Sequence, residues 1–257
     1  MNNRYVHFGS DIRAFNFMDD FAVINNSKRN LIKLFLDKLT IKSNLVRLLR
    51  YRIGGIYRGD GLGYDRNVET NKEIKRLQGY FQTYKHYLNN SNMTDLPKLE
   101  LKVQSEWFIN LKKIMLLKSI IVIHIRRGDY MEVSSSIGML SQDYYREATY
   151  QIHSILPEGE FWVFSDDVTA AKKTLHGIKM DKCTWISPPL GTNAAESLVL
   201  MSFGKAIITA NSTFSWWAAA SGNKSKNVIA PTPWFKNLDE PKDLIPEHWM
   251  RIKSSWI

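Results

Sequence analysis

The chain has 257 residues, of which 44% are hydrophobic and 12% aromatic, and this composition excludes a disordered protein. Its net charge of +10 points to an anionic partner such as a nucleotide, a phospholipid surface or nucleic acid. The single cysteine, Cys183, excludes an intramolecular disulfide framework and a thiolate zinc site. No signal peptide and no apolar stretch of roughly 20 residues is visible, so we expect a cytoplasmic protein.

Residues 28–58 form the most basic segment, with nine Lys or Arg against one acid, Asp37. Leucines recur between the charges at spacings close to a helical stripe. The simpler interpretation is a packed helix with a solvated basic face. The alternative is a peripheral contact with the anionic inner face of a membrane. The segment contains no recognised nucleic-acid motif, so we expect no nucleic-acid partner.

The predicted elements are mixed in the first part of the chain and regular after residue 119. Helices are predicted over 28–50, 70–90 and 99–117, and five glycines between residues 54 and 63 predict a turn-rich loop. Apolar strands then follow at 119–125, 161–164, 184–186, 206–210 and 227–230, with helices at 142–155, 168–175, 193–203 and 213–221. Alternation of strands and helices with short connections is typical of a doubly wound parallel sheet, so the predicted fold class is α/β.

The strand at 119–125 leads directly into charged residues, because His124, Arg126, Arg127 and Asp129 follow a fully apolar stretch. In an open α/β sheet, ligands bind just beyond the carboxyl ends of the strands. Guanidinium groups match phosphate oxygens bidentately and stay charged, so the two arginines predict a phosphate or pyrophosphate site. The alternative is a surface turn in which Asp129 neutralises one arginine.

A second strand, at 161–164, ends in Ser165, Asp166 and Asp167. The two carboxylates suit a ribose hydroxyl or the N–H edge of guanine. The alternative, equally favoured, is that Ser165 or Asp166 caps the next helix.

A third strand, at 206–210, turns through Asn211, Ser212 and Thr213 into a helix rich in tryptophan and alanine. Unpaired backbone N–H groups and the positive end of the helix dipole make such a turn an anion site, and the hydroxyls add donors. Capping alone would explain Ser212 or Thr213, but not the double tryptophan that follows.

These segments together resemble the α-1,2-fucosyltransferases of glycosyltransferase family 11. The resemblance rests on His-Ile-Arg-Arg-Gly-Asp-Tyr at 124–130, Phe-Ser-Asp-Asp at 164–167 and Ala-Asn-Ser-Thr-Phe-Ser-Trp-Trp-Ala-Ala at 210–219. Segments 79–82 and 196–202 are also similar to the family. The resemblance implies a GT-B-like architecture of two Rossmann-like halves, GDP-fucose as donor substrate, transfer with inversion, and no metal or other cofactor.

The family reaction implies roles for the residues named above. The 2-hydroxyl of a terminal galactoside would attack the anomeric carbon of fucose and give an α-1,2 linkage. One arginine would clamp the pyrophosphate and the other, held by Asp129, would be partly structural. The general base stays open between Asp129, Glu196 and an acid of the N-terminal half. The implied catalytic residues are Arg126, Arg127 and Asp129, and the implied donor-binding residues are His124, Asp166, Asp167, Glu196, Asn211, Ser212, Thr213 and Ser215.

The resemblance starts some tens of residues into the family pattern, near Asp11. The first strand of the family and its Gly-Gly-Leu-Gly-Asn-Gln-type loop have no counterpart before that point. We therefore expect an incomplete N-terminal, acceptor-side half at 1–115, a donor-binding half at 116–235, and a tail at 236–257 that packs back on the body. The expected acceptor is a galactose-terminated glycan or lipid-linked oligosaccharide in surface polysaccharide synthesis. An inactive or truncated GDP-sugar-binding module and a fucosyltransferase of another linkage remain as alternatives.

Overall fold

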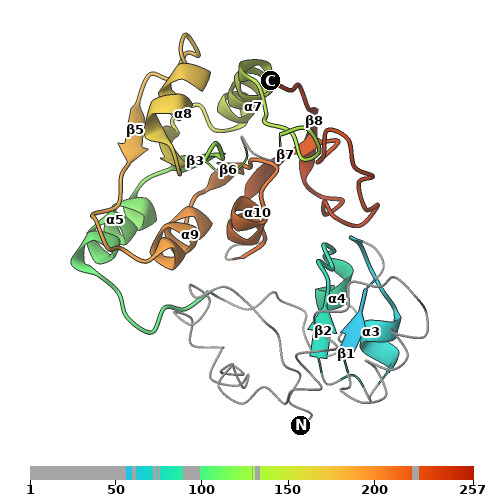
Figure 1. Cartoon of the computed structure of the whole chain (residues 1–257). Helices are drawn as coiled ribbons and strands as arrows, with labels where there is room; N and C mark the ends of the chain where they lie inside the picture. The colour runs from blue at the N-terminus through green and yellow to red at the C-terminus, as the bar shows by residue number, and fades with distance from the viewer. Residues whose placement is uncertain are drawn as a thin grey trace. The chain divides into compact units, whose positions relative to one another are not determined.

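The computed structural model describes residues 56–59, 62–71, 74, 76–88, 99–128, 130, 134–221 and 226–257. The predicted helix at 28–50, the basic segment up to residue 55 and the side chain of Asp129 lie outside this range. The chain divides into two compact units (Figure 1). Unit 1 comprises Met1–Asp95 and Pro241–Leu244, and unit 2 comprises Leu96–Glu240 and Ile245–Ile257.

The described part of unit 1 contains two short parallel strands, β1 (Ile56–Arg58) and β2 (Arg76–Gln78), with the short helices α3 (Asn67–Thr70) and α4 (Lys85–Leu88). Two predictions are wrong here. The glycine-rich loop at 54–63 contains β1, and the range predicted as one helix over 70–90 contains β2, a turn and only then the short helix α4. Gly79 and Phe81 have φ values of 156° and 42°, which no α-helix accommodates, so a continuous helix cannot pass through them.

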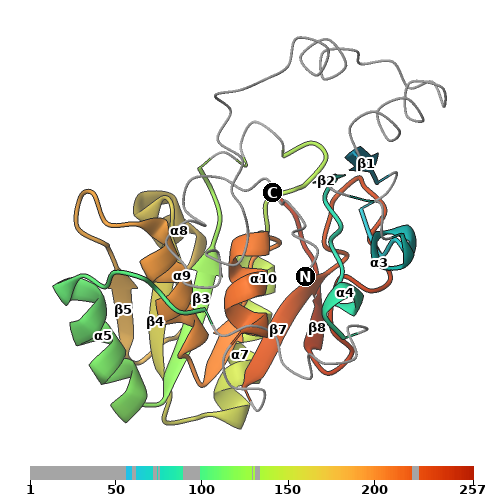
Figure 2. The ribbon, with the colours of Figure 1, turned by 90° about the horizontal axis from the view of Figure 1, so that it is seen from below.

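Unit 2 is built on a six-stranded sheet in which every neighbouring pair of strands is parallel (Figure 2). Its strands stand in the order β5-β4-β3-β6-β7-β8. Their bounds are β3 (Ile120–Ile125), β4 (Glu160–Ser165), β5 (Cys183–Ile186), β6 (Ala206–Ile208), β7 (Asn227–Thr232) and β8 (Met250–Lys253). The predicted α/β class and the doubly wound parallel sheet are confirmed.

Helices cover both faces of this sheet. In Figure 1, α7 (Gln142–Ile155) and α8 (Val168–Thr174) lie on one face, and α5 (Glu106–Leu117), α9 (Ala194–Ser202) and α10 (Thr213–Ala220) lie on the other. The four helices predicted between the strands are confirmed to within one or two residues. The helix predicted from residue 99 starts only at Glu106, because the Ser105 side chain accepts a hydrogen bond from the Phe108 N–H and caps it there.

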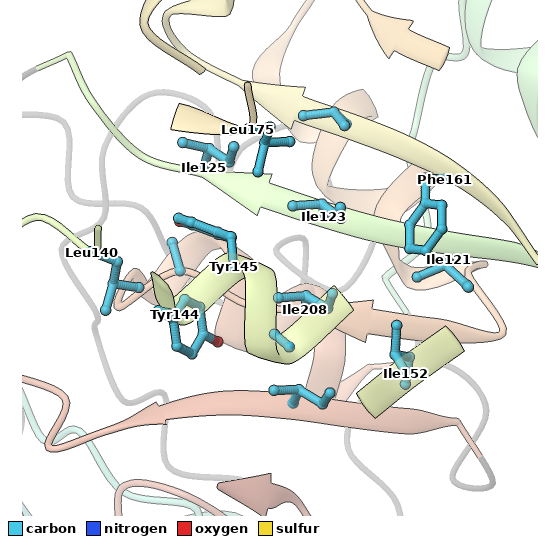
Figure 3. Packing of buried hydrophobic residues seen from close by; sticks show 14 of the residues in the cluster. Ile121, Ile123, Ile125, Leu140, Tyr144, Tyr145, Ile152, Phe161, Leu175 and Ile208 are labelled. Carbon is cyan, nitrogen blue, oxygen red and sulfur yellow. The ribbon is translucent and has the colours of Figure 1, made fainter. Parts of the chain in front are cut away.

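The central strand β3 is buried along its whole length. Figure 3 shows Ile121, Ile123 and Ile125 on the side of the sheet that faces α7, where Tyr145 and Ile152 complete the packing. Burying one such side chain contributes about 1.5–3 kcal/mol. Because β3 is held on both faces, the residues that follow it start from a rigid platform.

The unit boundaries differ from the predicted domains at both ends. Unit 2 begins at Leu96 rather than near residue 116, and it includes α5. The reason is a side-chain link: Glu196 on α9 accepts hydrogen bonds from the backbone N–H and the hydroxyl of Ser105, at 2.7 and 2.6 Å. The C-terminal segment 236–257, predicted only to pack back on the rest of the protein, also contributes strand β8 to the sheet.

Among the described residues, no helix combines the length and the apolar character needed to cross a bilayer.

Candidate functional site

The strand order of unit 2 reverses between β3 and β6. From β3 the chain winds outward through β4 to β5, then returns to place β6 on the other side of β3 and continues to β7 and β8. In doubly wound sheets, ligands bind at the carboxyl ends of the strands at this switch point. The loop that follows β3 and the turn that follows β6 therefore meet where a ligand is expected.

Two contacts place these segments side by side. The Tyr130 hydroxyl donates a hydrogen bond of 2.9 Å to the backbone carbonyl of Asn211. The His124 ring lies 5.6 Å from the Phe214 ring, measured between centroids. The arginine-bearing loop after β3 thus borders the N-terminus of α10.

Asp166, at the end of β4, organises the loop after β3. Its Oδ1 accepts the Arg127 N–H at 2.8 Å, and its Oδ2 accepts the Gly128 N–H at 3.0 Å and lies 3.2 Å from Arg126 Nε. A Cβ atom at Gly128 would lie 2.8 Å from Asp166 Oδ2, so glycine permits this close approach. Asp166 therefore shapes the loop and orients Arg126, a role that differs from the ribose or guanine contact expected from the sequence.

Arg127 points into the protein. Its residue is only 6% exposed, and its guanidinium donates to Thr174 Oγ1 at 3.0 and 3.2 Å and to the Leu140 carbonyl at 2.6 Å. Arg127 is therefore the structural arginine of the pair. Its described partners are neutral oxygens of Thr174, Leu140 and the neighbouring Arg126 carbonyl, which accepts at 3.1 Å, while the predicted partner Asp129 lies outside the described residues.

Arg126 is the more accessible of the two arginines, with 29% of its side chain exposed. One edge of its guanidinium is oriented by Asp166, and its Cζ lies 5.7 Å from the centre of the Tyr130 ring. This cation–π geometry and the Asp166 contact hold the planar, permanently charged guanidinium in a defined position beside Tyr130. Arg126 is therefore the better placed arginine to bind an anionic ligand.

His124 is 3% exposed, and its Nδ1 has no hydrogen-bond partner in the described part of the chain. Burial, and then the nearby Arg126 charge, lower the pKa of His124 from 6.5 to about 3. The ring is therefore a neutral imidazole at physiological pH. It can exchange a hydrogen bond with a ligand but does not supply a positive charge.

The polar residues after β6 divide into two groups. Asn211 donates its amide to the carbonyls of Ile137 and Gly138, at 3.1 and 3.0 Å. The buried Ser215 hydroxyl faces the carbonyls of Ala210 and Ser212, at 3.3 and 3.1 Å. Asn211 and Ser215 thus hold the turn in shape.

Ser212 and Thr213 have a different environment. Ser212 occupies the N-cap position of α10 but makes no side-chain capping hydrogen bond, and Thr213 is exposed. Ser212 is only 5% exposed, so the exposed Thr213 hydroxyl and the backbone N–H groups of the first helical turn are the donors of this segment best placed for an anion.

Two further predicted donor-binding residues have structural partners. Asp167 caps α8 by accepting the Ala170 N–H at 2.9 Å, so the helix is capped by Asp167 rather than by Ser165 or Asp166. Both carboxylate oxygens of Glu196 bind Ser105, as described above. No group of three or more His, Cys, Asp or Glu among the described residues is arranged to hold a metal ion.

Sequence reasoning missed three supporting residues. Thr174 binds Arg127, Tyr130 contacts both Arg126 and Asn211, and the Tyr145 hydroxyl donates to the His124 carbonyl at 3.3 Å. Tyr130 stands inside the quoted motif, so its position was visible, but its partner is 81 residues away in the chain. No pattern in the sequence identifies such a contact.

Comparisons with known proteins identify similar glycosyltransferases. Two curated proteins of Escherichia coli are similar: an "Alpha-1,2-colitosyltransferase", 36% identical over 51% of this chain and 47% of its own length, and the "O-antigen biosynthesis glycosyltransferase WbnK", 34% identical over 51% and 43%. The chain thus spans about half the length of these relatives. A crystal structure of a glycosyl transferase family 9 protein from Veillonella parvula DSM 2008 aligns over 77% of this chain and 56% of its own, with a TM-score of 0.41 and 10% identity.

The family comparison covers more of the chain. The model of glycosyl transferase family 11 matches residues 77–253, which include every strand of the six-stranded sheet and both loops of the candidate site. The chain therefore belongs to glycosyl transferase family 11.

Proposed function

We propose that this protein transfers L-fucose from GDP-fucose to the 2-hydroxyl of a terminal galactoside, with inversion, in the synthesis of a surface polysaccharide or glycan. Family membership supports a nucleotide-sugar donor and a glycan acceptor. The observation that carries the proposal is that the loop bearing Arg126 borders the turn into α10 at the switch point of the sheet: Tyr130, which lies against Arg126, donates a hydrogen bond to the Asn211 carbonyl. A cation and a set of helix N–H groups at one point suit a diphosphate.

In the proposed reaction, the acceptor 2-oxygen forms a bond to the anomeric carbon of fucose from the face opposite the diphosphate. The bond between that carbon and the β-phosphate oxygen breaks, and its electrons leave with GDP. The hydroxyl proton passes to a general base. Arg126, the Thr213 hydroxyl and the backbone N–H groups of the first turn of α10 would stabilise the charge that grows on the β-phosphate. Preorganised donors of this kind commonly contribute about 3 kcal/mol each.

The same arrangement makes a metal-independent transfer part of the proposal. A fixed guanidinium and a helix N-terminus supply positive charge at the leaving group without a change in protonation. His124 contributes no charge, since its pKa of about 3 keeps the ring neutral. The reaction would therefore need no cofactor beyond the donor itself.

A second donor sugar has specific support. One relative carries the name "Alpha-1,2-colitosyltransferase", and it is 36% identical to this chain. Its name favours the α-1,2 linkage and makes nucleotide-activated colitose a second candidate donor. In this proposal Arg126 and the N-terminus of α10 bind the diphosphate, so they would recognise the two donors alike.

The acceptor and the cellular location complete the proposal. The name of the second relative, an O-antigen biosynthesis glycosyltransferase, supports a surface polysaccharide or lipid-linked oligosaccharide as acceptor. Such an acceptor fits a cytoplasmic protein that touches the inner face of a membrane through the basic segment at 28–58.

The test is product analysis. The protein is incubated with GDP-fucose, or with the colitose donor, and a β-galactoside, and the product linkage is determined by NMR. An α-1,2-linked product supports the proposal, and the preferred sugar identifies the donor. A product with another linkage would show that the enzyme is a fucosyltransferase of that linkage and would rule out the proposed α-1,2 specificity. GDP binding in calorimetry without any transfer favours a binding module, and the absence of both overturns the proposal.

A further inference from the structure

Tyr130 links the two halves of the candidate site. Its ring lies beside the Arg126 guanidinium, with Cζ 5.7 Å from the ring centre, and its hydroxyl donates to the Asn211 carbonyl at 2.9 Å. Asn211 is the residue before the N-cap of α10. One side chain therefore touches both the arginine and the turn that precedes the helix N-terminus.

Both ends of this link are held in place. Asn211 is 2% exposed, and its amide is fixed by the carbonyls of Ile137 and Gly138. On the other side, Asp166 holds Arg126 Nε at 3.2 Å. The guanidinium is thus located by a carboxylate at its edge and by an aromatic ring at its face.

We infer that Tyr130 is a positioning residue for donor binding: it sets the place of Arg126 relative to the N-terminus of α10, and so adjusts the site to a nucleoside diphosphate. The inference rests on the proposed function. A clamp of this kind works only when its donors are held to within a fraction of an ångström, about 0.5 Å. Tyr130 supplies that restraint through its ring, which lies against Arg126, and its hydroxyl, which binds the Asn211 carbonyl.

The test compares GDP with GMP, because only GDP carries the β-phosphate that Arg126 is proposed to hold. Binding of each nucleotide is measured by calorimetry for the wild type and for Tyr130→Leu. We expect Tyr130→Leu to lower the affinity for GDP about tenfold and to change the affinity for GMP less than about twofold. An equal loss for both nucleotides would mean a general effect on folding and would overturn the inference.

A double-mutant cycle tests whether Tyr130 acts through Arg126. In the Arg126→Met background, Tyr130→Leu should cause no further loss of GDP affinity, whereas independent effects would multiply and contradict the inference. The matched control is Tyr150→Leu on α7, a tyrosine that is 70% exposed and should leave both affinities unchanged.

A milder variant covers the case in which Tyr130→Leu does not fold. Tyr130→Phe keeps the ring and removes the link to Asn211, and we expect about threefold weaker GDP binding with unchanged GMP binding. Unchanged binding of both nucleotides in the folded Tyr130 variants overturns the inference alone. A wild type that binds no GDP overturns the proposed function instead.

Discussion

Adjacent residues at the end of β3 point to opposite sides, and this alternation separates the two arginines. Ile125 belongs to the cluster on the α7 side, while His124 contacts Phe214 of α10 on the other face. The same alternation continues beyond the strand. Arg127 therefore reaches Thr174 of α8 in the interior, and Arg126 stays on the side of α10.

The two arginines should respond differently to substitution by lysine. Arg126→Lys keeps the charge but loses the planar fork, so we expect about a 100-fold lower kcat for transfer with little change in stability. Arg127→Lys leaves buried carbonyl and hydroxyl groups without donors, so we expect a free energy of unfolding lower by about 2 kcal/mol and a smaller loss of turnover. Kinetics and urea denaturation of both variants check this. If Arg126→Lys turned over normally and Arg127→Lys lost turnover, Arg127 rather than Arg126 would be the arginine that binds the ligand.

His124 should make stability depend on pH. Its pKa is about 3 in the folded protein, against 6.5 ordinarily, so below pH 6.5 the unfolded chain binds a proton that the folded chain does not. The free energy of unfolding should therefore fall as the pH is lowered from 6.5 toward 3. At pH 5 this contribution is about 2 kcal/mol lower than at neutral pH. Denaturation at pH 7 and pH 5 measures the effect. His124→Phe removes the titrating group, and an equally steep dependence in that variant would show that another residue causes it.

At the scale of elements, Lys226 joins the ends of α9 and α10. Its buried ammonium donates to the carbonyls of Ser202, Ala218 and Ser221, at 2.7, 3.1 and 2.8 Å. Burial lowers the pKa of Lys226 to about 7, while three carbonyls at helix C-termini favour the ammonium. The lysine thus satisfies acceptors that the two helices leave open and fixes the C-terminal end of α10.

Lys226→Met tests this link, because methionine fills a similar volume but donates no hydrogen bond. We expect the free energy of unfolding to fall by about 3 kcal/mol, since buried carbonyls lose their donors. Thermal or urea denaturation measures the change. Lys205→Met, at an exposed lysine next to β6, is the control and should have almost no effect. A loss no larger than that of the control would contradict the structural role of Lys226.

At the scale of the whole molecule, the proposed catalysis depends on fixed charges rather than on a metal ion. If the proposed reaction holds, fucose transfer by the intact protein should be unchanged after treatment with EDTA, because Arg126 and the N-terminus of α10 would supply the positive charge at the leaving group. Initial rates with and without the chelator measure this. A rate that falls with EDTA and recovers with added Mg²⁺ or Mn²⁺ would show that the charge is supplied differently.

Local patterns predicted most of unit 2. Buried parallel strands such as β3 read as continuous apolar runs, and the helices between them have clear polar boundaries. The prediction of a single helix over 70–90 is wrong, because the backbone at Gly79 and Phe81 has positive φ values. In addition, β2 pairs with β1, a partner that no local pattern reveals. Strand β8 was missed for a related reason: its four residues have only one buried member, so it shows no apolar run.

The parallel α/β sheet, and the charged and hydroxyl residues that follow three of its strands, could be predicted from the amino-acid sequence, since hydrophobic runs and motifs are local properties of a chain. The contacts of these residues emerged only in the folded protein. Folding brought Tyr130 to Asn211, turned Arg127 and Glu196 toward structural partners, and left Arg126 accessible. Those roles depend on contacts between residues far apart in the chain, which arise only when strands that are distant in sequence become neighbours in the sheet.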